Sequence, residues 1–192
     1  MKIQSAEFIL GAVKKEQFPQ DLPEIAVVGR SNVGKSSLLN FLLGRKKLVS
    51  FSRTPGKTRQ INYFKINGTF YFVDIPGFGY AKMGKGEQEA MLKSIESYFT
   101  SSRKIAGILF LFDIRVRRSK VDEESLEWVS QFGLPMLFLA TKGDKLKFQE
   151  IKKAKKELQD NYSLQTPPLI TSSVKKTGSE EVWSAIQLLL DG

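Results

Sequence analysis

Residues 29–36 read Gly-Arg-Ser-Asn-Val-Gly-Lys-Ser, and this stretch limits the possible folds of the chain more than any other. It fits the phosphate-loop pattern, in which a glycine and four variable residues precede Gly-Lys-Ser, and it lies between an apolar strand pattern and an apolar helix pattern. This order aims backbone N–H groups and the positive end of the helix at one point, where a polyphosphate can accept their hydrogen bonds. We therefore expect Lys35 to reach the β- and γ-phosphates and the hydroxyl of Ser36 to bind a magnesium ion.

The composition excludes several kinds of chemistry. The 192 residues suffice for one domain with a sizeable core, and they include neither cysteine nor histidine. Disulfides, thiolate or imidazole metal sites and histidine-based catalysis are excluded, which leaves carboxylates, hydroxyls, amines and a hard metal such as Mg²⁺. The longest apolar run, residues 105–112, is too short to cross a membrane, and the N-terminus lacks a signal-peptide pattern. We expect a cytoplasmic protein without membrane contact.

The net charge of +10 indicates a polyanionic partner, and the partner expected on this basis is nucleic acid. Basic residues recur in predicted loops at residues 45–47, 115–118 and 175–176 as well as on helices. The alternative is that lysine-rich helix faces only keep the domain soluble.

Strand and helix patterns alternate along the chain. We expect strands at residues 24–29, 61–66, 69–74, 105–113, 136–141 and 169–171, and helices near residues 37–43, 87–102, 122–132, 148–158 and 179–190. The apolar face of the fourth helix is expected to hold Phe148, Ile151, Ala154 and Leu158. Asn67-Gly68 favours a tight hairpin, which places one antiparallel strand at the sheet edge.

These elements predict a three-layer α/β fold with a mainly parallel, six-stranded sheet. Residues 24–192 are expected to form a single domain, with residues 1–23 as an extension packed on its edge. The ligand of such a sheet lies beyond the C-terminal ends of the parallel strands. Residues 45–60 and 78–86 are expected to be loops.

Three further motifs follow the phosphate loop in the order of a translation-factor-type GTPase. Asp-Ile-Pro-Gly at residues 74–77 ends a strand, where the Asp74 carboxylate can hold magnesium and the Gly77 N–H can reach the γ-phosphate. Thr-Lys-Gly-Asp at residues 141–144 ends another strand, and Ser172-Ser173 follows the last. Order and spacing make this set more specific than any single motif.

The motif at residues 141–144 predicts which base is bound. Guanine offers two adjacent donors, N1–H and the exocyclic amine, to one carboxylate, so Asp144 can bind guanine with both oxygens, whereas adenine presents a lone pair there. Lys142 is expected to lie along the purine face. A backbone N–H near Ser172 or Ser173 would face guanine O6.

Four stretches of the sequence together resemble the EngB GTPases, also called YihA or YsxC, within the larger group that includes Era and TrmE. They are residues 29–36, 53–58 (Arg-Thr-Pro-Gly-Lys-Thr), 74–81 and 141–144, and the resemblance runs from about residue 5 to the C-terminus. It implies a Ras-like domain, Mg²⁺-dependent binding and hydrolysis of GTP, and a role in assembling the bacterial large ribosomal subunit. The family's more usual histidine is replaced by Val116, to which we assign no role.

The same resemblance favours Thr58 over Thr54 as the metal-reaching threonine, although spacing alone does not exclude Thr54. Many GTPases carry a water-orienting glutamine where this chain has Phe78, so intrinsic hydrolysis is expected to be slow. In related GTPases an asparagine at the position of Asn32 helps hold K⁺, and we hypothesise K⁺ stimulation here, against a role for Asn32 in loop shape alone. Contact with the ribosome is the other candidate stimulus.

The predicted site combines these motifs. Catalytic roles are expected for Lys35, Asn32, Thr58 and Gly77, and magnesium ligation for Ser36, Thr58 and Asp74. Contacts with GTP or GDP are expected for Gly29, Arg30, Ser31, Asn32, Val33, Gly34, Lys35, Ser36, Ser37, Gly56, Lys57, Thr58, Asp74, Ile75, Pro76, Gly77, Thr141, Lys142, Asp144, Ser172, Ser173 and Val174. The expected partner is the large ribosomal subunit, bound by a monomer. Two other functions stay open: an RNA-binding assembly scaffold with structural nucleotide, and a phosphate-loop nucleotide kinase or ATPase.

Overall fold

A computed structural model describes residues 1–45, 48–49, 60–79, 84–101 and 104–192 of the chain. Its strands are β1 (Ala6–Ala12), β2 (Glu24–Gly29), β3 (Ile61–Ile66), β4 (Phe70–Asp74), β5 (Ile105–Asp113), β6 (Met136–Thr141) and β7 (Leu169–Ile170). Its α-helices are α1 (Lys35–Leu42), α2 (Lys85–Ser101), α3 (Lys120–Ser130), α4 (Phe148–Asn161) and α5 (Ser179–Asp191), with short 3₁₀ turns at Lys15–Gln17 and Gly143–Lys145. Most of the predicted loop at residues 45–60, and residues 80–83 of the second one, lie outside the described residues.

The strands form one sheet in the order β1-β3-β4-β2-β5-β6-β7. Strand β2 lies between β4 and β5 and is parallel to both, and the β5, β6 and β7 pairs are also parallel. Strand β3 runs antiparallel to its neighbours β1 and β4. The predicted α/β fold with a mainly parallel sheet is confirmed, but the count of six strands is wrong, because the N-terminal extension supplies β1 as a seventh strand at the edge.

The hairpin between β3 and β4 also fixes the N-terminal segment. Asn67 and Gly68 have φ angles of 49° and 69°, as a tight turn of this kind requires. The side-chain oxygen of Asn67 accepts hydrogen bonds from the N–H groups of Gln4 (2.8 Å) and Ser5 (3.1 Å), and its amide donates to Lys2 O (2.9 Å). The turn therefore holds the residues that lead into β1.

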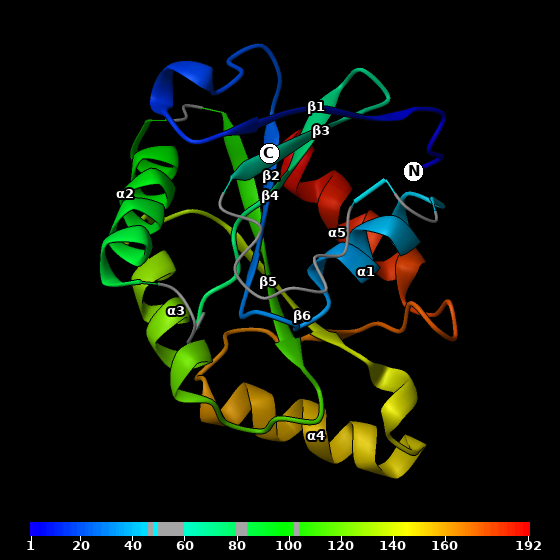
Figure 1. The fold of residues 1–192 in the computed structure, drawn as a ribbon. Helices are drawn as coiled ribbons and strands as arrows, with labels where there is room; N and C mark the ends of the chain where they lie inside the picture. The colour runs from blue at the N-terminus through cyan, green and yellow to red at the C-terminus, as the bar shows by residue number, and fades with distance from the viewer. Residues whose placement is uncertain (46–47, 50–59, 80–83, 102–103) are drawn as a thin grey trace.

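Helices cover both faces of the sheet (Figure 1). Because side chains alternate along a strand, Ala26 and Val28 of β2 face the helices α2, α3 and α4, while Ile25 and Val27 face α1 and α5. In β5, Phe110 and Phe112 likewise face α2, α3 and α4, while Leu109 and Leu111 face α1 and α5. Two buried cores result, one on each face, as expected for three layers.

Helix ends follow local capping more than apolar periodicity. Helix α3 begins at Lys120 rather than at the predicted residue 122, because the Ser119 side chain accepts a hydrogen bond from Asp122 N–H. The expectation for Phe148 is wrong: its side chain is 68% exposed at the start of α4, and the Lys152 ammonium lies 4.9 Å from its ring. Among the described residues, no helix has both the length and the apolar character needed to span a membrane.

Candidate nucleotide-binding site

The sequence motifs gather at the C-terminal ends of the parallel strands. The phosphate loop follows β2, Asp74 ends β4, Thr141 ends β6, and Ser172 follows β7. In a parallel sheet of this kind, ligands usually bind at that edge, near the point where the order of the strands reverses.

The phosphate loop turns through two left-handed residues, Asn32 (φ 61°) and Gly34 (φ 114°). Val33 N–H donates to Arg30 O at 3.2 Å, and Leu38 N–H donates to Gly34 O at 2.9 Å, which begins α1. The start of α1 therefore leaves its first N–H groups directed at the mouth of the loop, as an anionic ligand requires.

Lys35 and Asp74 face one another inside this loop. The Lys35 ammonium donates to Gly29 O at 3.3 Å, and burial lowers its pKa while the charge of Asp74 raises it. Burial raises the pKa of Asp74 to about 6, and the charge of Lys35 opposes that rise. Asp74 Oδ1 is buried without a hydrogen-bond partner among the described residues. A hard divalent cation would supply that partner, so the donors fit Mg²⁺, with Ser36 at the start of α1 as the second protein ligand.

Gly77 lies directly against the loop. A Cβ atom added to Gly77 would lie 2.9 Å from Lys35 Nζ and 3.0 Å from Ser31 N. Ser31 N–H donates to Phe78 O at 2.9 Å, while Ile75 N–H donates to Val27 O at 3.2 Å. The Asp-Ile-Pro-Gly segment, including Pro76, is thus held beside the phosphate loop, where its backbone can respond to a γ-phosphate.

The side chain of Phe78 lies outside the phosphate loop. Its side chain is buried and packs against Trp128 of α3, with ring centroids 5.8 Å apart. An apolar ring in that position cannot orient water.

The Thr-Lys-Gly-Asp motif forms the wall of a cavity of about 210 Å³. Lys142 is left-handed (φ 63°), and Gly143 N–H donates to Thr171 O at 3.0 Å, so the motif turns against the end of β7. The residues that line this cavity are Ser37, Leu38, Thr141, Lys142, Asp144, Lys145, Thr171, Ser173 and Val174. Residues from the end of β6, the loop after β7 and the start of α1 therefore surround one space.

Asp144 is held ionised within that wall. Ser172 Oγ donates to Asp144 Oδ1 at 2.8 Å, and this hydrogen bond lowers the carboxyl pKa, with help from Lys145. The Ser172 N–H donates to Thr177 O, so it is not free for a ligand. Ser172 thus positions the carboxylate, and Ser173 and Val174 are left as the residues of this loop that face the cavity.

Two contacts join the motif at residues 141–144 to the phosphate loop. Thr141 Oγ1 donates to Val33 O at 2.6 Å, and Lys142 Nζ donates to Asn32 O at 2.8 Å. The two motifs, separated by more than a hundred residues in sequence, form one connected wall. Gly56, Lys57 and Thr58, with the alternative Thr54, lie outside the described residues, so their roles stay predictions.

Comparison with known proteins decides the family. The sequence profile of a family described as "50S ribosome-binding GTPase" matches residues 24–142. A probable GTP-binding protein EngB of Clostridioides difficile (strain 630) is 45% identical over 191 residues, which cover 97% of this chain and 93% of that protein. Another from Clostridium botulinum (strain Alaska E43 / Type E3) is 46% identical over 95% of this chain and 93% of its own length. The chain belongs to the EngB family of GTP-binding proteins.

Solved structures agree with the EngB fold. The crystal structure of a probable GTP-binding protein EngB has a TM-score of 0.73 at 22% identity, over 88% of this chain and 98% of that one. Era in complex with MgGDPNP and a 16S ribosomal RNA fragment has a TM-score of 0.71 at 25% identity, over 90% of this chain and 58% of that one. The resemblance to EngB that the motifs predicted is confirmed, and with it membership of a GTPase family.

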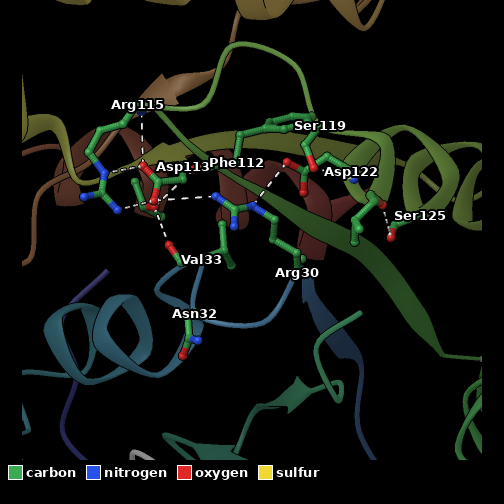
Figure 2. Close-up of polar contacts among 12 residues, drawn as sticks. Arg30, Asn32, Val33, Phe112, Asp113, Arg115, Ser119, Asp122 and Ser125 are labelled. Carbon is green, nitrogen blue, oxygen red and sulfur yellow. Dashed lines mark hydrogen bonds and ion pairs between the residues drawn. The ribbon is translucent and has the colours of Figure 1, made fainter. Parts of the chain in front are cut away.

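This EngB chain also contains a buried charged cluster that the sequence analysis missed. Arg30 lies between the carboxylates of Asp113 and Asp122, at 3.7 Å and 3.4 Å, and Figure 2 shows its guanidinium directed at both. Asp113 also accepts hydrogen bonds from Arg115 (2.7 Å) and Lys142 (2.7 Å). The Arg30 side chain is thus committed to the protein, and its backbone is what remains for a nucleotide. The available signal was the position of Asp113 at the end of a fully apolar strand beside β2.

Proposed function

We propose that this EngB protein is a Mg²⁺-dependent GTP switch that hydrolyses GTP slowly and acts in the assembly of the bacterial large ribosomal subunit. The proposal rests on the hydrogen bonds of Thr141 and Lys142 to the phosphate loop. They connect the phosphate loop with the Thr-Lys-Gly-Asp motif, which would bind the base. One nucleotide lying along this wall would meet the base-reading carboxylate and the phosphate-binding amides together. The matched family's description, which names 50S ribosome binding, and the net charge of +10 support the partner.

Each side chain has a defined task in this scheme. Asp144 accepts guanine N1–H and the exocyclic amine, the Lys142 stem covers the purine face, and Lys35 neutralises the phosphates. Ser36, Asp74 and Thr58 would hold Mg²⁺, which when bound offsets negative charge on the β- and γ-phosphates.

Slow turnover follows from the position of Phe78. Its ring packs on Trp128, so no side chain of this motif orients the attacking water. A missing positively charged finger group can be worth about 10³ to 10⁵ in rate, and ribosomal particles or K⁺ would supply that charge. Loss of the γ-phosphate would release the segments around Thr58 and Gly77 and so change the surface offered to the ribosome.

Co-sedimentation with purified large subunits tests the switch. We expect more protein in the pellet with GDPNP than with GDP, and less in both as salt rises from about 50 to 200 mM, because phosphate contacts weaken with salt. Equal binding in the two nucleotide states would contradict a switch. Multiple-turnover hydrolysis with and without the subunits separates the switch from a scaffold, since a scaffold would show no stimulation.

The choice of base has its own test. Asp144→Asn should weaken GTP binding by about tenfold or more, since a charged hydrogen-bonding pair is worth about 1.5 to 3 kcal/mol, and should improve XTP binding. The matched control is Asp160→Asn, which makes the same change at an exposed position of α4. ATP binding as tight as GTP binding in the wild type would favour the kinase or ATPase alternative.

Asn32 remains the proposed K⁺ ligand. The backbone carbonyl oxygen of Asn32 accepts a hydrogen bond from the Lys142 ammonium, while the Asn32 side chain points away from the charged cluster of Figure 2. We expect faster hydrolysis in K⁺ than in Na⁺ for the wild type and equal rates for Asn32→Gly, which keeps the left-handed backbone. Equal rates in the wild type would remove K⁺ from the mechanism.

The proposal further takes residues 24–192 as a single nucleotide-binding domain in a cytoplasmic monomer.

A further inference from the structure

We propose that the groove between α2 and α3 is a docking site for a cationic polypeptide segment that inserts a bulky apolar side chain. The groove has a volume of about 530 Å³ and is lined by Phe78, Gly79, Gln88, Glu89, Leu92, Lys93, Glu96, Val121, Glu124, Ser125 and Trp128. It shares none of these residues with the cavity next to Asp144. The inference rests on the proposed function only where it concerns dependence on GTP.

The walls of the groove are apolar. Leu92 from α2, Val121 and Trp128 from α3, and the ring of Phe78 form them. Leu92, Val121 and Trp128 are each partly buried and pack on the core of that sheet face. A volume of this size accommodates one or two large side chains, and a concave apolar surface with a polar rim is the usual form of a recognition site.

The charge of the rim identifies the partner. The charged residues that line the groove are three glutamates, Glu89, Glu96 and Glu124, and one lysine, Lys93. Glu124 also pairs with Lys120 at 3.6 Å, and the other acidic residues of α3 are not among those that line the groove, since Asp122 lies beside Arg30 and Glu123 pairs with Arg118. The rim is acidic through its three glutamates, although the whole chain has a net charge of +10. An acidic face on a basic protein repels RNA phosphates and attracts lysine and arginine, so complementarity favours a basic polypeptide.

The groove is connected to the phosphate loop through Phe78. Phe78 O accepts Ser31 N–H at 2.9 Å and Phe78 N–H donates to Gly29 O at 3.4 Å, while the ring of Phe78 packs on Trp128. Gly79 fits closely as well, because a Cβ atom there would lie 2.9 Å from Val121 Cγ1. A shift of Phe78 on γ-phosphate binding would therefore change the shape of this wall of the groove.

Tryptophan fluorescence tests the site directly. The chain contains two tryptophans, and Trp183 lies in the core on the opposite face, so Trp183→Phe leaves Trp128 as the sole reporter. The probe is a twelve-residue peptide of repeating Lys-Leu-Arg-Phe, compared with one of repeating Lys-Ser-Arg-Ser and with a single-stranded RNA dodecamer. We expect saturable quenching by the first peptide, with at least tenfold weaker binding of the second.

Matched variants locate the binding. Glu89→Lys with Glu96→Lys, or Leu92→Lys alone, should weaken the first peptide at least tenfold. The control pair Glu7→Lys with Asp191→Lys makes the same change in net charge at exposed positions away from the groove, and should leave affinity within twofold. Equal weakening by both pairs would reduce the binding to general electrostatics and overturn the proposal. Quenching by the RNA but not by the peptide, or dimerisation of the protein through this face in sedimentation velocity, would also overturn it.

Nucleotide dependence is measured separately. The peptide should bind the Mg·GDPNP and GDP forms with affinities that differ at least threefold. GTP affinity and subunit co-sedimentation are measured in the same protein, so absence of peptide binding by the protein with an unaltered groove, with both of the other activities retained, refutes the groove alone. If the protein binds the peptide but does not co-sediment with the large subunit, the proposed function is refuted instead.

Discussion

Asp113 is a buried carboxylate that faces three cations, Arg30, Arg115 and Lys142. Burial by itself would raise its pKa, but the hydrogen bonds from Arg115 and Lys142 hold the pKa well below its usual range. Because Lys142 also donates to Asn32 O, this carboxylate stabilises the link between the Thr-Lys-Gly-Asp motif and the phosphate loop.

Asp113→Asn should therefore weaken folding and nucleotide binding together. We expect unfolding free energy to fall by about 3 kcal/mol, as when one member of a buried ion pair is removed, and GDP affinity to fall as Lys142 loses one of its two partners. Arg115→Ala serves as the control, since it removes a half-exposed partner and should cost less than about 1 kcal/mol. Urea denaturation with and without GDP measures both effects.

Asp122 introduces a dependence of stability on pH. Burial raises its pKa to about 6, against the attraction of Arg30 and the effect of the nearby Ser119 hydroxyl. The folded protein therefore keeps a proton between about pH 4 and 6 that an unfolded aspartate has released. The contribution of this group to stability is present below that range and is lost as the pH rises through about 6.

Comparison with Asp122→Asn isolates this effect. In the absence of nucleotide, the unfolding free energy of the wild type minus that of the variant should increase by about 1 kcal/mol as the pH falls from 7 to 5. Urea denaturation across that range gives the difference, and Glu127→Gln at an exposed position of α3 is the control. A difference that stays constant with pH would show that Asp122 does not titrate there.

At the scale of elements, Asn67 determines how β1 is held. Asn67→Ala removes three hydrogen bonds to residues 2–5 and keeps a Cβ atom at a φ of 49°, whereas Asn67→Gly removes the bonds and the Cβ atom together. Both variants should speed hydrogen exchange at the Gln4 and Ser5 amides. The alanine variant should cost about 1 kcal/mol more, because a left-handed backbone disfavours a side chain. Unchanged exchange in both would mean that β1 is held by its pairing with β3 alone.

How well the elements could be predicted depended on burial. Strands β2, β3, β5 and β6 were predicted with their observed bounds, because apolar residues bound by polar or turn residues mark a buried strand. Strand β1 was missed because its pairing register shifts between Phe8 and Leu10, which breaks the alternation that would identify it. Its outward Phe8, 52% exposed, packs instead on Phe64 with ring centroids 5.5 Å apart.

At the scale of the whole molecule, local motifs predicted more than distant contacts did. The phosphate loop and the Thr-Lys-Gly-Asp motif are continuous in sequence, so their patterns carry their geometry. The ion pair of Arg30 with Asp122 joins residues far apart in the chain, and no local pattern marks it. The second role of Ser172, as the residue that orients Asp144, also depends on a fold contact.

The proposed magnesium site leads to a prediction for the complete protein. Among the described residues there is no group of three acidic side chains that could hold a metal ion. Mg²⁺ alone should therefore leave the melting temperature unchanged, since one buried carboxylate with a raised pKa binds it weakly. Mg²⁺ with GTP should raise it by several degrees, and EDTA should remove most of that gain, because the phosphates complete the coordination. Thermal denaturation in the four conditions tests this, and a large shift with Mg²⁺ alone would contradict it.

Asn32 and Lys142 stand at the two ends of one hydrogen bond, and both adopt left-handed backbone angles that glycine accepts more easily. A screen that rewards heat resistance alone would be drawn to glycine at position 32, because Asn32 enters this bond through its backbone carbonyl, which glycine also has. The same screen would keep lysine at position 142, because its ammonium pairs with the buried Asp113 carboxylate. A screen that rewards stimulation by K⁺ would keep asparagine at position 32, so laboratory evolution should show the two pressures in conflict there.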